Sequence, residues 1–313
     1  MNIGIDMMGG DYAPLEAVKA MQQYLTEAIE AIHLHLIGDQ QQLEPLLSEY
    51  AIPTQSYTIH HASQVIGMQE HSTKALKEKT KSSIAIGFTL LASDEIDAFI
   101  SAGNTGAMLV GSLYSLKPLQ GVLRPTISTI IPKADGSTGL LLDVGLNSDC
   151  KPEFLNQFAV MGSVYAQNIL GIANPRVALL NIGEEEGKGN LLCQATYPLL
   201  KANKHINFVG NVEGRDVFLD KADVMVCDGF TGNIILKLAE SLFHITREKE
   251  ITHAYLDRFN FEDYGGTPVL GISKPVIIGH GISKKDAFKN KILLAQKMIE
   301  SDVMQKLAIE VST

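Results

Sequence analysis

Short runs of apolar and β-branched residues alternate along this chain with longer segments that have the period of a helix. This alternation is typical of βαβ units, in which parallel strands are joined by crossover helices. It predicts an α/β protein, a three-layer α/β/α sandwich with a mostly parallel sheet. The 313 residues, of which 45% are hydrophobic, are enough to bury the core of such a sandwich.

The expected elements follow from where the apolar runs and the helical periods begin and end. The expected strands are residues 2–5, 32–37, 98–101, 126–131, 139–142, 177–180, 207–210, 224–227 and 276–278. The expected helices are residues 14–30, 82–93, 105–116, 152–170, 191–202, 231–246 and 285–301. Residues 1–313 are expected to form one domain, and charged and aromatic residues near 247–263 indicate a projecting helical segment, residues 234–263.

Charge, cysteine spacing and hydropathy argue against several classes of protein. A formal net charge of −9 disfavours a nucleic acid as partner, because its phosphates repel an acidic protein. Cys150, Cys193 and Cys227 lack the paired spacing of structural zinc sites and of a disulfide framework. No apolar run reaches the roughly 18 residues that cross a bilayer, and the residues after Met1 do not resemble a secretion signal. A reducing cytoplasm is the expected location.

Two glycine-rich loops follow predicted strands, at the position where open parallel sheets bind ligands. The first is S-A-G-N-T-G at 101–106, and the second is D-G-F-T-G-N at 228–233. Small residues let backbone N–H groups and a helix N-terminus face an anion, so phosphate is the expected ligand. Either loop alone would more often be a tight turn between a strand and a helix. The Asn and Thr donors in both loops favour a shared anion site.

Further polar segments are expected at the same edge of the sheet. They are D-M-M-G-G-D at 6–11, D-V-G-L-N at 143–147, N-I-G-E-E-E-G-K-G at 181–189 and G-N-V-E-G at 210–214. Lys188, between two glycines, can place a point charge beside a phosphate or a developing oxyanion. The alternative is an ion pair at the surface between Lys188 and one of the glutamates at 184–186. For residues 6–11 the alternative is a turn with an Asp cap.

Late in the chain, His280 lies between Gly279 and Gly281, after a predicted strand. A neutral imidazole there can hydrogen-bond substrate or protonate a leaving thiolate, although such a histidine more often only begins a helix. Two basic groups are candidates for docking an acidic carrier protein, with solvated helix faces as the alternative. The groups are Lys74, Lys77, Lys79 and Lys81, and Arg247, Lys249 and Arg258.

With these motifs in order, the sequence resembles the bacterial acyl-acyl-carrier-protein:phosphate acyltransferases along nearly its whole length. The resemblance rests on D-M-M-G-G-D at 6–11, S-A-G-N-T-G-A at 101–107, D-V-G with Asn147, D-C-K-P at 149–152, N-I-G at 181–183, G-N at 210–211, D-G-F-T-G-N at 228–233, Y-G-G at 264–266 and H-G at 280–281. Two features depart from the family pattern: Leu146 replaces a small residue, and the stretch between Asn233 and Tyr264 is shorter than the family's projecting helical pair.

The resemblance implies transfer of a long-chain fatty acyl group from acyl carrier protein to inorganic phosphate, which gives acyl phosphate for phospholipid biosynthesis. It implies a fold similar to phosphate acetyltransferases and isocitrate-dehydrogenase-like enzymes. It also implies a homodimer in the cytoplasm, at the inner face of the membrane, near a membrane-bound glycerol-3-phosphate acyltransferase. No cofactor and no metal are expected.

Transfer of an acyl group to phosphate requires a held nucleophile, donors for the tetrahedral oxyanion and a proton or positive charge for the thiolate. We expect Asn104, Thr105 and Lys188 to bind phosphate, and Asp228 to orient a donor. The expected catalytic residues are Lys188, Asn233, Asp228 and His280. The expected substrate-binding residues are Asp6, Gly10, Asp11, Gly103, Asn104, Thr105, Gly106, Asn147, Asn181, Asn211, Thr231 and Gly232.

Three other functions were compared with this one. A phosphate acetyltransferase that uses acetyl-coenzyme A differs in acyl length and carrier, which the residues do not decide. An NAD-dependent dehydrogenase is disfavoured because G-x-G-x-x-G with a later acidic residue is missing. A non-catalytic acyl-binding or anion-binding regulator would use the same pocket without turnover. Cys227 is not expected to form an acyl-enzyme, because it ends a strand buried on both faces and precedes Asp228.

Overall fold

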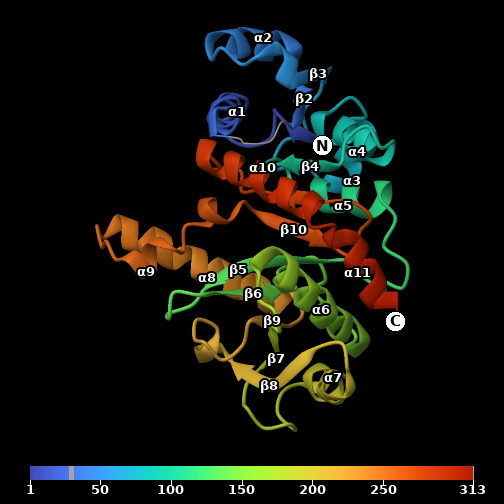
Figure 1. Cartoon of the computed structure of the whole chain (residues 1–313), viewed down its shortest axis with the longest axis vertical. Helices are drawn as coiled ribbons and strands as arrows, with labels where there is room; N and C mark the ends of the chain where they lie inside the picture. Colours follow the sequence, from blue (N-terminus) through green and yellow to red (C-terminus); the bar gives the residue numbers. More distant parts are fainter. Residues whose placement is uncertain (28–31, 313) are drawn as a thin grey trace. The chain divides into compact units, whose positions relative to one another are not determined.

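The computed structural model describes residues 1–27 and 32–312, and the chain divides into two compact units (Figure 1). The first unit contains Met1–Lys117 and Phe261–Glu300, and the second contains Pro118–Asn260 and Ser301–Thr313. The prediction that residues 1–313 act as one domain stays a prediction.

The first unit is built on a sheet with the strand order β3-β2-β1-β4-β11-β10. The strands run parallel, except that β10 pairs antiparallel with β11. Their bounds are β1 Asn2–Asp6, β2 His33–Gly38, β3 Tyr57–His61, β4 Ala98–Ser101, β10 Thr267–Leu270 and β11 Val276–Ile278. Strands β1, β4 and β11 are neighbours, so their carboxyl ends lie at the same edge of the sheet.

Helices cover both faces of this sheet. One layer holds α1, α2 and α10, and the other holds α3, α4 and α5 (Figure 1). The bounds are α1 Leu15–Glu27, α2 Gln40–Glu49, α3 Ser72–Glu78, α4 Ser83–Ala92, α5 Thr105–Ser115 and α10 Lys285–Glu300, with 3-10 turns at Thr54–Ser56 and Phe261–Tyr264. Phe88 of α4 packs edge to face on Phe99 of β4, with ring centroids 5.3 Å apart. Both rings are buried, so this aromatic pair anchors the helix to the sheet.

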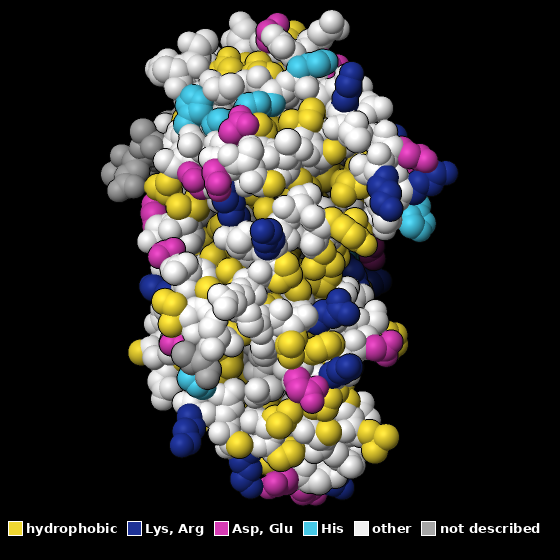
Figure 2. Space-filling view, turned by 90° about the vertical axis from the view of Figure 1, so that its right-hand side faces the viewer, with side chains coloured by type: hydrophobic (Ala, Val, Ile, Leu, Met, Phe, Trp, Pro, Cys, Tyr) yellow, Lys and Arg dark blue, Asp and Glu magenta, His cyan; other side chains and the backbone are white. Residues whose placement is uncertain are grey.

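Histidine side chains gather at the outer strands of the first unit, where β2 and β3 pair (Figure 2). His35 Nδ1 lies 2.9 Å from His60 Nε2, and the two rings stack with centroids 5.1 Å apart. The ring of His33 meets His35 edge-on at 5.3 Å. Partial burial, followed by repulsion from His60 and His33, lowers the pKa of His35 to about 4. Protonation of His35 is therefore disfavoured in the folded chain.

The second unit has the strand order β5-β6-β9-β7-β8. Strands β5 and β6 form an antiparallel pair, and the other neighbours are parallel. Helices α6, α7 and α11 pack together on one face, and α8 packs against β6 on the other. The bounds are β5 Thr126–Pro132, β6 Thr138–Leu142, β7 Arg176–Asn181, β8 Asn207–Glu213, β9 Val224–Val226, α6 Pro152–Tyr165 with a π turn Ala166–Leu170, α7 Leu191–Ala202, α8 Gly229–Glu248, α9 Ala254–Asp257 and α11 Val303–Ser312, with a 3-10 turn at Gly214–Asp216.

A buried charge network supports the sheet of the second unit at the end opposite to the strand carboxyl termini. Lys133 Nζ is fully buried and lies 2.7 Å from Asp223 and 3.1 Å from Asp220. Arg176 pairs with the same two carboxylates. Burial alone would raise the pKa of Asp223, but the hydrogen bonds from Arg176 and Lys133 hold it well below its ordinary value. Loss of Lys133 or Arg176 would leave the two carboxylates with a single cation between them, which is destabilising for buried charges.

The predicted fold class is confirmed, because each unit has a mostly parallel sheet between helical layers. All the expected strands and helices are present within a few residues, and residues 28–30 of the expected first helix lie outside the described residues. The prediction missed β3, β10, α2, α3 and α11, whereas α9 lies within the helical segment expected at residues 234–263. Strand β3 reads Y-T-I-H-H, which is not an apolar run, and α2 carries Pro45 in its interior. Among the described helices, none is both long enough and apolar enough to cross a membrane.

Candidate functional site

The loops after β1 and β4 are joined through a buried carboxylate in the first unit. Asp6 ends β1, and its Oδ2 accepts a 2.6 Å hydrogen bond from the Ser101 hydroxyl. Ser101 Oγ in turn accepts from the Gly103 N–H at 2.9 Å, and Asp6 Oδ1 accepts from the Met8 N–H at 3.1 Å. Complete burial raises the pKa of Asp6, although these hydrogen bonds act in the opposite direction. Asp6 therefore fixes the two loops and does not face solvent.

Glycines let three loops of the first unit touch through their backbones. A Cβ on Gly9 would lie 2.6 Å from the Gly103 nitrogen, so a side chain there would push the first two loops apart. The Asp11 N–H donates to the Gly281 carbonyl at 2.7 Å, which brings in the loop after β11. His280, half-buried, directly precedes Gly281. The structure thus brings together the predicted residues Asp6, Gly10, Asp11, Gly103 and His280.

Asn104 supports the start of helix α5. Its Oδ1 caps the helix by accepting from the Ala107 N–H at 2.9 Å. Its Nδ2 donates to three carbonyls in the loop before α3: Gly67 at 2.9 Å, Glu70 at 3.1 Å and Met68 at 3.2 Å. The side chain is buried and fully engaged, so it positions the loop and the helix. Thr105 and Gly106, by contrast, lie in the first helical turn, whose N–H groups have no acceptor within the helix.

In the second unit, Asp143 organises the loop after β6. It is fully buried, and its carboxylate accepts from the N–H groups of Leu146 at 3.1 Å and Asn147 at 2.6 Å. It also accepts from Gly145 N–H at 3.2 Å and from Asn147 Nδ2 at 2.8 Å. The second proton of that amide goes to the Pro125 carbonyl. The predicted residue Asn147 is consequently held inside its own loop.

The loop between β9 and α8 packs directly on the Asp143 loop. Asp228 caps α8, because it accepts from the N–H of Thr231 at 2.8 Å and from its hydroxyl at 2.9 Å. A Cβ on Gly232 would overlap the carbonyl oxygen of Asp143, so only glycine permits this contact. Asn233 is exposed and donates from Nδ2 to the Val144 carbonyl at 3.1 Å. The predicted residues Asp228, Thr231, Gly232 and Asn233 therefore lie together with Asn147.

Two asparagines from neighbouring strands hold the loop that carries Lys188. Asn181 Nδ2 at the end of β7 donates to the Lys188 carbonyl at 3.1 Å. Asn211 Nδ2 in β8 donates to the Glu185 carbonyl at 2.9 Å, and its buried Oδ1 has no hydrogen-bond partner among the described residues. Both amides therefore act on the loop backbone.

Lys188 itself points to solvent. Its side chain is 52% exposed, and Nζ lies 3.9 Å from Glu185 Oε1. The structure therefore contains the surface ion pair that was the alternative for this residue. A pair this exposed contributes little to stability, so it leaves the ammonium free to exchange partners. The catalytic role of Lys188 stays a prediction.

A cavity of about 230 Å³ lies at the carboxyl ends of β7 and β9 in the second unit. Its walls come from α6, β7, the following loop, α7 and α8, and they consist of Leu155, Leu180, Asn181, Ile182, Gly189, Asn190, Cys193, Cys227, Asp228 and Thr231. Burial, followed by the nearby carboxylates Asp228 and Asp143, raises the pKa of Cys227 well above its ordinary value. The expectation that Cys227 is buried is confirmed, and the expectation that no acyl-enzyme forms stays a prediction.

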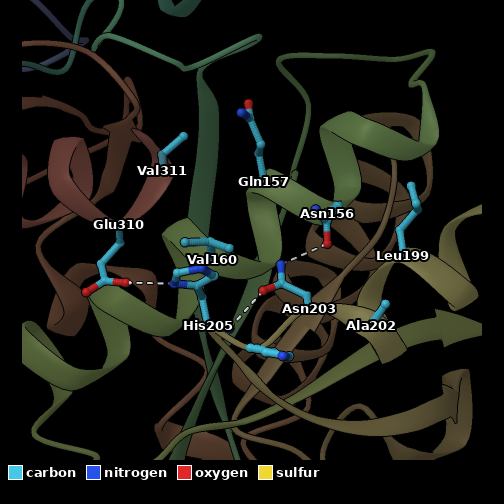
Figure 3. Close-up of a pocket in the computed structure, with 10 residues that line it drawn as sticks. Asn156, Gln157, Val160, Leu199, Ala202, Asn203, His205, Glu310 and Val311 are labelled. Atoms are coloured by element: carbon cyan, nitrogen blue, oxygen red, sulfur yellow. Dashed lines mark hydrogen bonds and ion pairs between the residues drawn. The ribbon is translucent and has the colours of Figure 1, made fainter. Parts of the chain in front are cut away.

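A larger hollow of about 430 Å³ lies between α6, α7 and α11 (Figure 3). Its polar side chains bind one another: Asn203 Nδ2 donates to Asn156 Oδ1 at 2.9 Å, and His205 Nδ1 lies 3.2 Å from Glu310 Oε2. Among its described lining residues, none belongs to the predicted site. This hollow is therefore separate from the strand ends that carry the glycine-rich loops.

The predicted site residues thus form two groups, one in each unit. The sequence reasoning quoted Ser101 and Asp143 only as parts of motifs, although both are hubs of hydrogen bonds. It did not identify Cys193 or Ile182 as cavity residues. A carboxylate directly after a buried strand was the signal for Asp143, whereas no local pattern marks Cys193. Within residues 1–27 and 32–312, no group of three His, Cys, Asp or Glu side chains is placed to hold a metal ion.

Comparison with solved structures shows the same fold in acyl-transferring enzymes. A phosphotransacetylase from Streptococcus pyogenes matches with a TM-score of 0.68 and 18% identity, over 96% of this chain and 94% of that one. A branched-chain phosphotransacylase from Enterococcus faecalis matches with a TM-score of 0.64 and 16% identity, over 95% and 99% of the two chains. At this identity the likeness establishes the fold.

Other relatives have a much higher sequence identity to this chain than these solved structures have. The family model described as "Fatty acid synthesis protein" matches residues 1–306. A protein named phosphate acyltransferase from Dictyoglomus turgidum is 42% identical over 98% of this chain and 96% of its own length. Another of the same name, from Thermoanaerobacterium thermosaccharolyticum, is 42% identical over 99% and 97% of the two chains. The chain therefore belongs to the phosphate acyltransferase family of enzymes.

Proposed function

We propose that this enzyme transfers a long-chain fatty acyl group from the thioester of acyl carrier protein to inorganic phosphate, for phospholipid biosynthesis. A phosphate oxygen attacks the thioester carbonyl, the C–S bond breaks, and the products are an acyl phosphate and the carrier thiol. The observation that carries the proposal is the near-complete match to phosphate acyltransferases, combined with glycine loops at the strand carboxyl ends in each unit.

In the proposed reaction the protein itself does not have to supply the nucleophile. Phosphate dianion is already a nucleophile, so the enzyme has mainly to position it, exclude water and stabilise the oxyanion. We propose that the first turn of α5, with the N–H groups of Thr105 and Gly106, binds phosphate. A helix N-terminus favours an anion, and its Asn104 cap adds no negative charge. The cap of α8 is the carboxylate of Asp228, which repels an anion.

Lys188, Asn233 and His280 are proposed to act on the reacting groups. Exposure of Lys188 and Asn233 leaves both side chains accessible to substrate. His280 is proposed to protonate the leaving thiolate, and the contact between Asp11 and Gly281 would hold its loop in place. Asp228, Asn104, Asn181 and Asn211 are proposed to position the loops, since their polar atoms bind the backbone.

The test measures thiol release from palmitoyl-acyl carrier protein with and without phosphate, together with trapping of acyl phosphate by hydroxylamine. Thiol release should depend on phosphate, and the hydroxamate should appear in equal amount. Equal release without phosphate would contradict the proposal. The same assay with acetyl-coenzyme A examines the second candidate, a phosphate acetyltransferase, which the phosphotransacetylase fold of the solved relatives favours. A protein that binds acyl donors without any turnover would be a regulator.

A homodimer formed through α8 is part of the proposal. The helix carries a row of exposed apolar side chains along one face: Phe230 at 64%, Ile234 at 53%, Leu238 at 60%, Leu242 at 37% and Ile245 at 51%. Residues three or four positions apart share a helix face, so this apolar stripe is continuous. A second copy of the chain would cover it by matching the stripe with itself around a two-fold axis. Leu238→Lys should convert the dimer to a monomer in analytical ultracentrifugation, and a monomeric wild type would contradict the proposal.

Carrier protein is proposed to dock beside α3 in the first unit. Lys74, Lys77 and Lys81 are exposed on or near this helix, and the loop before it is bound by Asn104 at the start of α5. A basic surface next to the proposed phosphate site complements an acidic carrier. We further propose that the enzyme works in the cytoplasm, at the inner face of the membrane, and supplies acyl phosphate to a membrane-bound glycerol-3-phosphate acyltransferase.

A further inference from the structure

The cavity in the second unit is formed by segments that meet at strand ends. Leu180 and Asn181 end β7, Cys227 follows β9, and Cys193 lies in the first turn of α7. Leu155 of α6 also lines the cavity. Leu155, Leu180 and Cys227 are all buried, so the deep part of the cavity is apolar.

The polar residues around this cavity are already bonded to their own chain. Asn181 donates to the Lys188 carbonyl and accepts from the Ile182 N–H at 2.8 Å. Both Asp228 oxygens accept from Thr231. Among the described residues that line the cavity, none is Lys or Arg, and its one charged side chain is the Asp228 carboxylate. A phosphate would meet repulsion here and would find no cation to neutralise it.

Two of the thiols add to the apolar wall. Burial raises the pKa of Cys193 and of Cys227, so both stay protonated at neutral pH and behave as small apolar groups. Ile182 lines the cavity and is 81% exposed, and Leu191, which directly follows the lining residue Asn190, is 85% exposed. Such large apolar side chains standing in solvent beside an apolar cavity are suited to cover a ligand of the same character.

We propose that this cavity binds the fatty acyl chain of the donor, an assignment that rests on the proposed acyl transfer. Its size sets how much of the chain enters. A dry cavity of about 150 Å³ holds benzene, with its six carbons. By proportion, a cavity of about 230 Å³ holds roughly nine carbons. About nine carbons of a long chain therefore fit inside the cavity, and the remainder extends past Ile182 at its rim.

The experiment compares kcat/KM for phosphate-dependent thiol release from butyryl-, octanoyl-, dodecanoyl- and palmitoyl-acyl carrier protein. For the wild type, kcat/KM should rise from butyryl to octanoyl by up to roughly fourfold per methylene, because each buried methylene contributes about 0.8 kcal/mol. The rise should level off beyond roughly nine carbons.

Cys193→Phe should fill the cavity and lower the octanoyl-to-butyryl ratio of kcat/KM at least tenfold. Ala195→Phe is the matched control, because Ala195 lies on the same helix and faces solvent, and it should keep the wild-type ratio. An unchanged ratio in Cys193→Phe, with phosphate-dependent release intact, overturns the acyl assignment alone. Absence of phosphate-dependent release from every donor in the wild type overturns the proposed function instead.

A second measurement on the wild type does not depend on whether Cys193→Phe folds. Alkylation of Cys193 by a neutral maleimide is followed by peptide mass spectrometry. A non-hydrolysable decanoyl-pantetheine amide should slow alkylation of Cys193 at least fivefold, and inorganic phosphate alone should not. Protection by phosphate, or no protection by the decanoyl compound, contradicts the assignment.

Discussion

A buried lysine in the first unit should make the stability of this enzyme depend on pH in an unusual direction. Lys291 in α10 is almost completely buried, and its Nζ donates to the Ser283 hydroxyl at 3.0 Å and lies 4.3 Å from the centre of the Phe288 ring. Burial lowers the pKa of Lys291 from 10.5 to about 7, although Glu262 acts in the opposite direction. The amine is therefore largely neutral in the folded enzyme above pH 7.

The sign of the effect follows from proton counting. Between pH 7 and 10.5 the unfolded chain carries a proton on Lys291 that the folded chain lacks. Stability therefore rises with pH in this range, by about 1.4 kcal/mol per pH unit for one proton. From pH 7 to 9.5 this single group should add roughly 3 kcal/mol to the free energy of unfolding.

Replacing Lys291 with Met keeps the length of the side chain and removes the titration. Urea unfolding at several pH values should show that the free energy of unfolding of wild type minus that of Lys291→Met rises by roughly 3 kcal/mol between pH 7 and 9.5. Lys297→Met, on the exposed face of the same helix, is the control and should leave the wild-type dependence unchanged. If the difference between wild type and Lys291→Met is constant across this range, Lys291 is not neutral in the folded state and the reasoning fails.

Three further predictions concern single side chains. Lys188→Ala should lower kcat by about 10² or more with an unchanged melting temperature, the loss expected for a transition-state charge partner; unchanged kinetics would leave Lys188 as a surface ion pair with Glu185. Cys227→Ala should keep activity within about tenfold, and mass spectrometry of enzyme mixed with palmitoyl-acyl carrier protein without phosphate should find no acyl adduct; an adduct discharged by phosphate would establish a covalent mechanism. Stability should also fall as the pH drops from 6.5 towards 4, because the folded-state pKa of His35 is lowered to about 4 and only the unfolded chain is easily protonated there. His35→Phe should weaken this pH dependence of the melting temperature. An unchanged pH dependence would show that a group other than His35 causes it.

The fold could be predicted from the sequence because its signal is local. The apolar runs at Val177 and Val224 and the helical periods between them are consequences of burial, and burial repeats with the geometry of each element. Strand β3 was missed because Thr58 and His60, which share one face of the strand, replace the apolar residues expected in a buried strand. Helix α11 was missed because it follows α10 after a short break at Asp302.

The sequence predicts which residues lie at the candidate site, but it does not predict what each side chain binds. The side-chain amides of Asn104 and Asn181 could donate hydrogen bonds to an anion. The sequence cannot show that these amides instead donate to backbone carbonyls. The same holds for Asp228, whose oxygens both bind Thr231. The cavity beside Cys193 needs the packing of separate strands and helices, so no spacing along the chain could reveal it.

Helix α8 carries both residues of the proposed site and the apolar stripe proposed to form the dimer, which matters for anyone who wishes to engineer the enzyme. Its 20 residues span about 30 Å, and its first turn is locked against the Asp143 loop by Gly232. Substitutions at Phe230 or Ile234 would disturb that locked turn together with the apolar stripe. Leu238 and Ile245 lie more than one turn beyond Ile234, so charged residues at these two positions should improve solubility and remove the proposed self-association while the loops at the strand ends keep their shape.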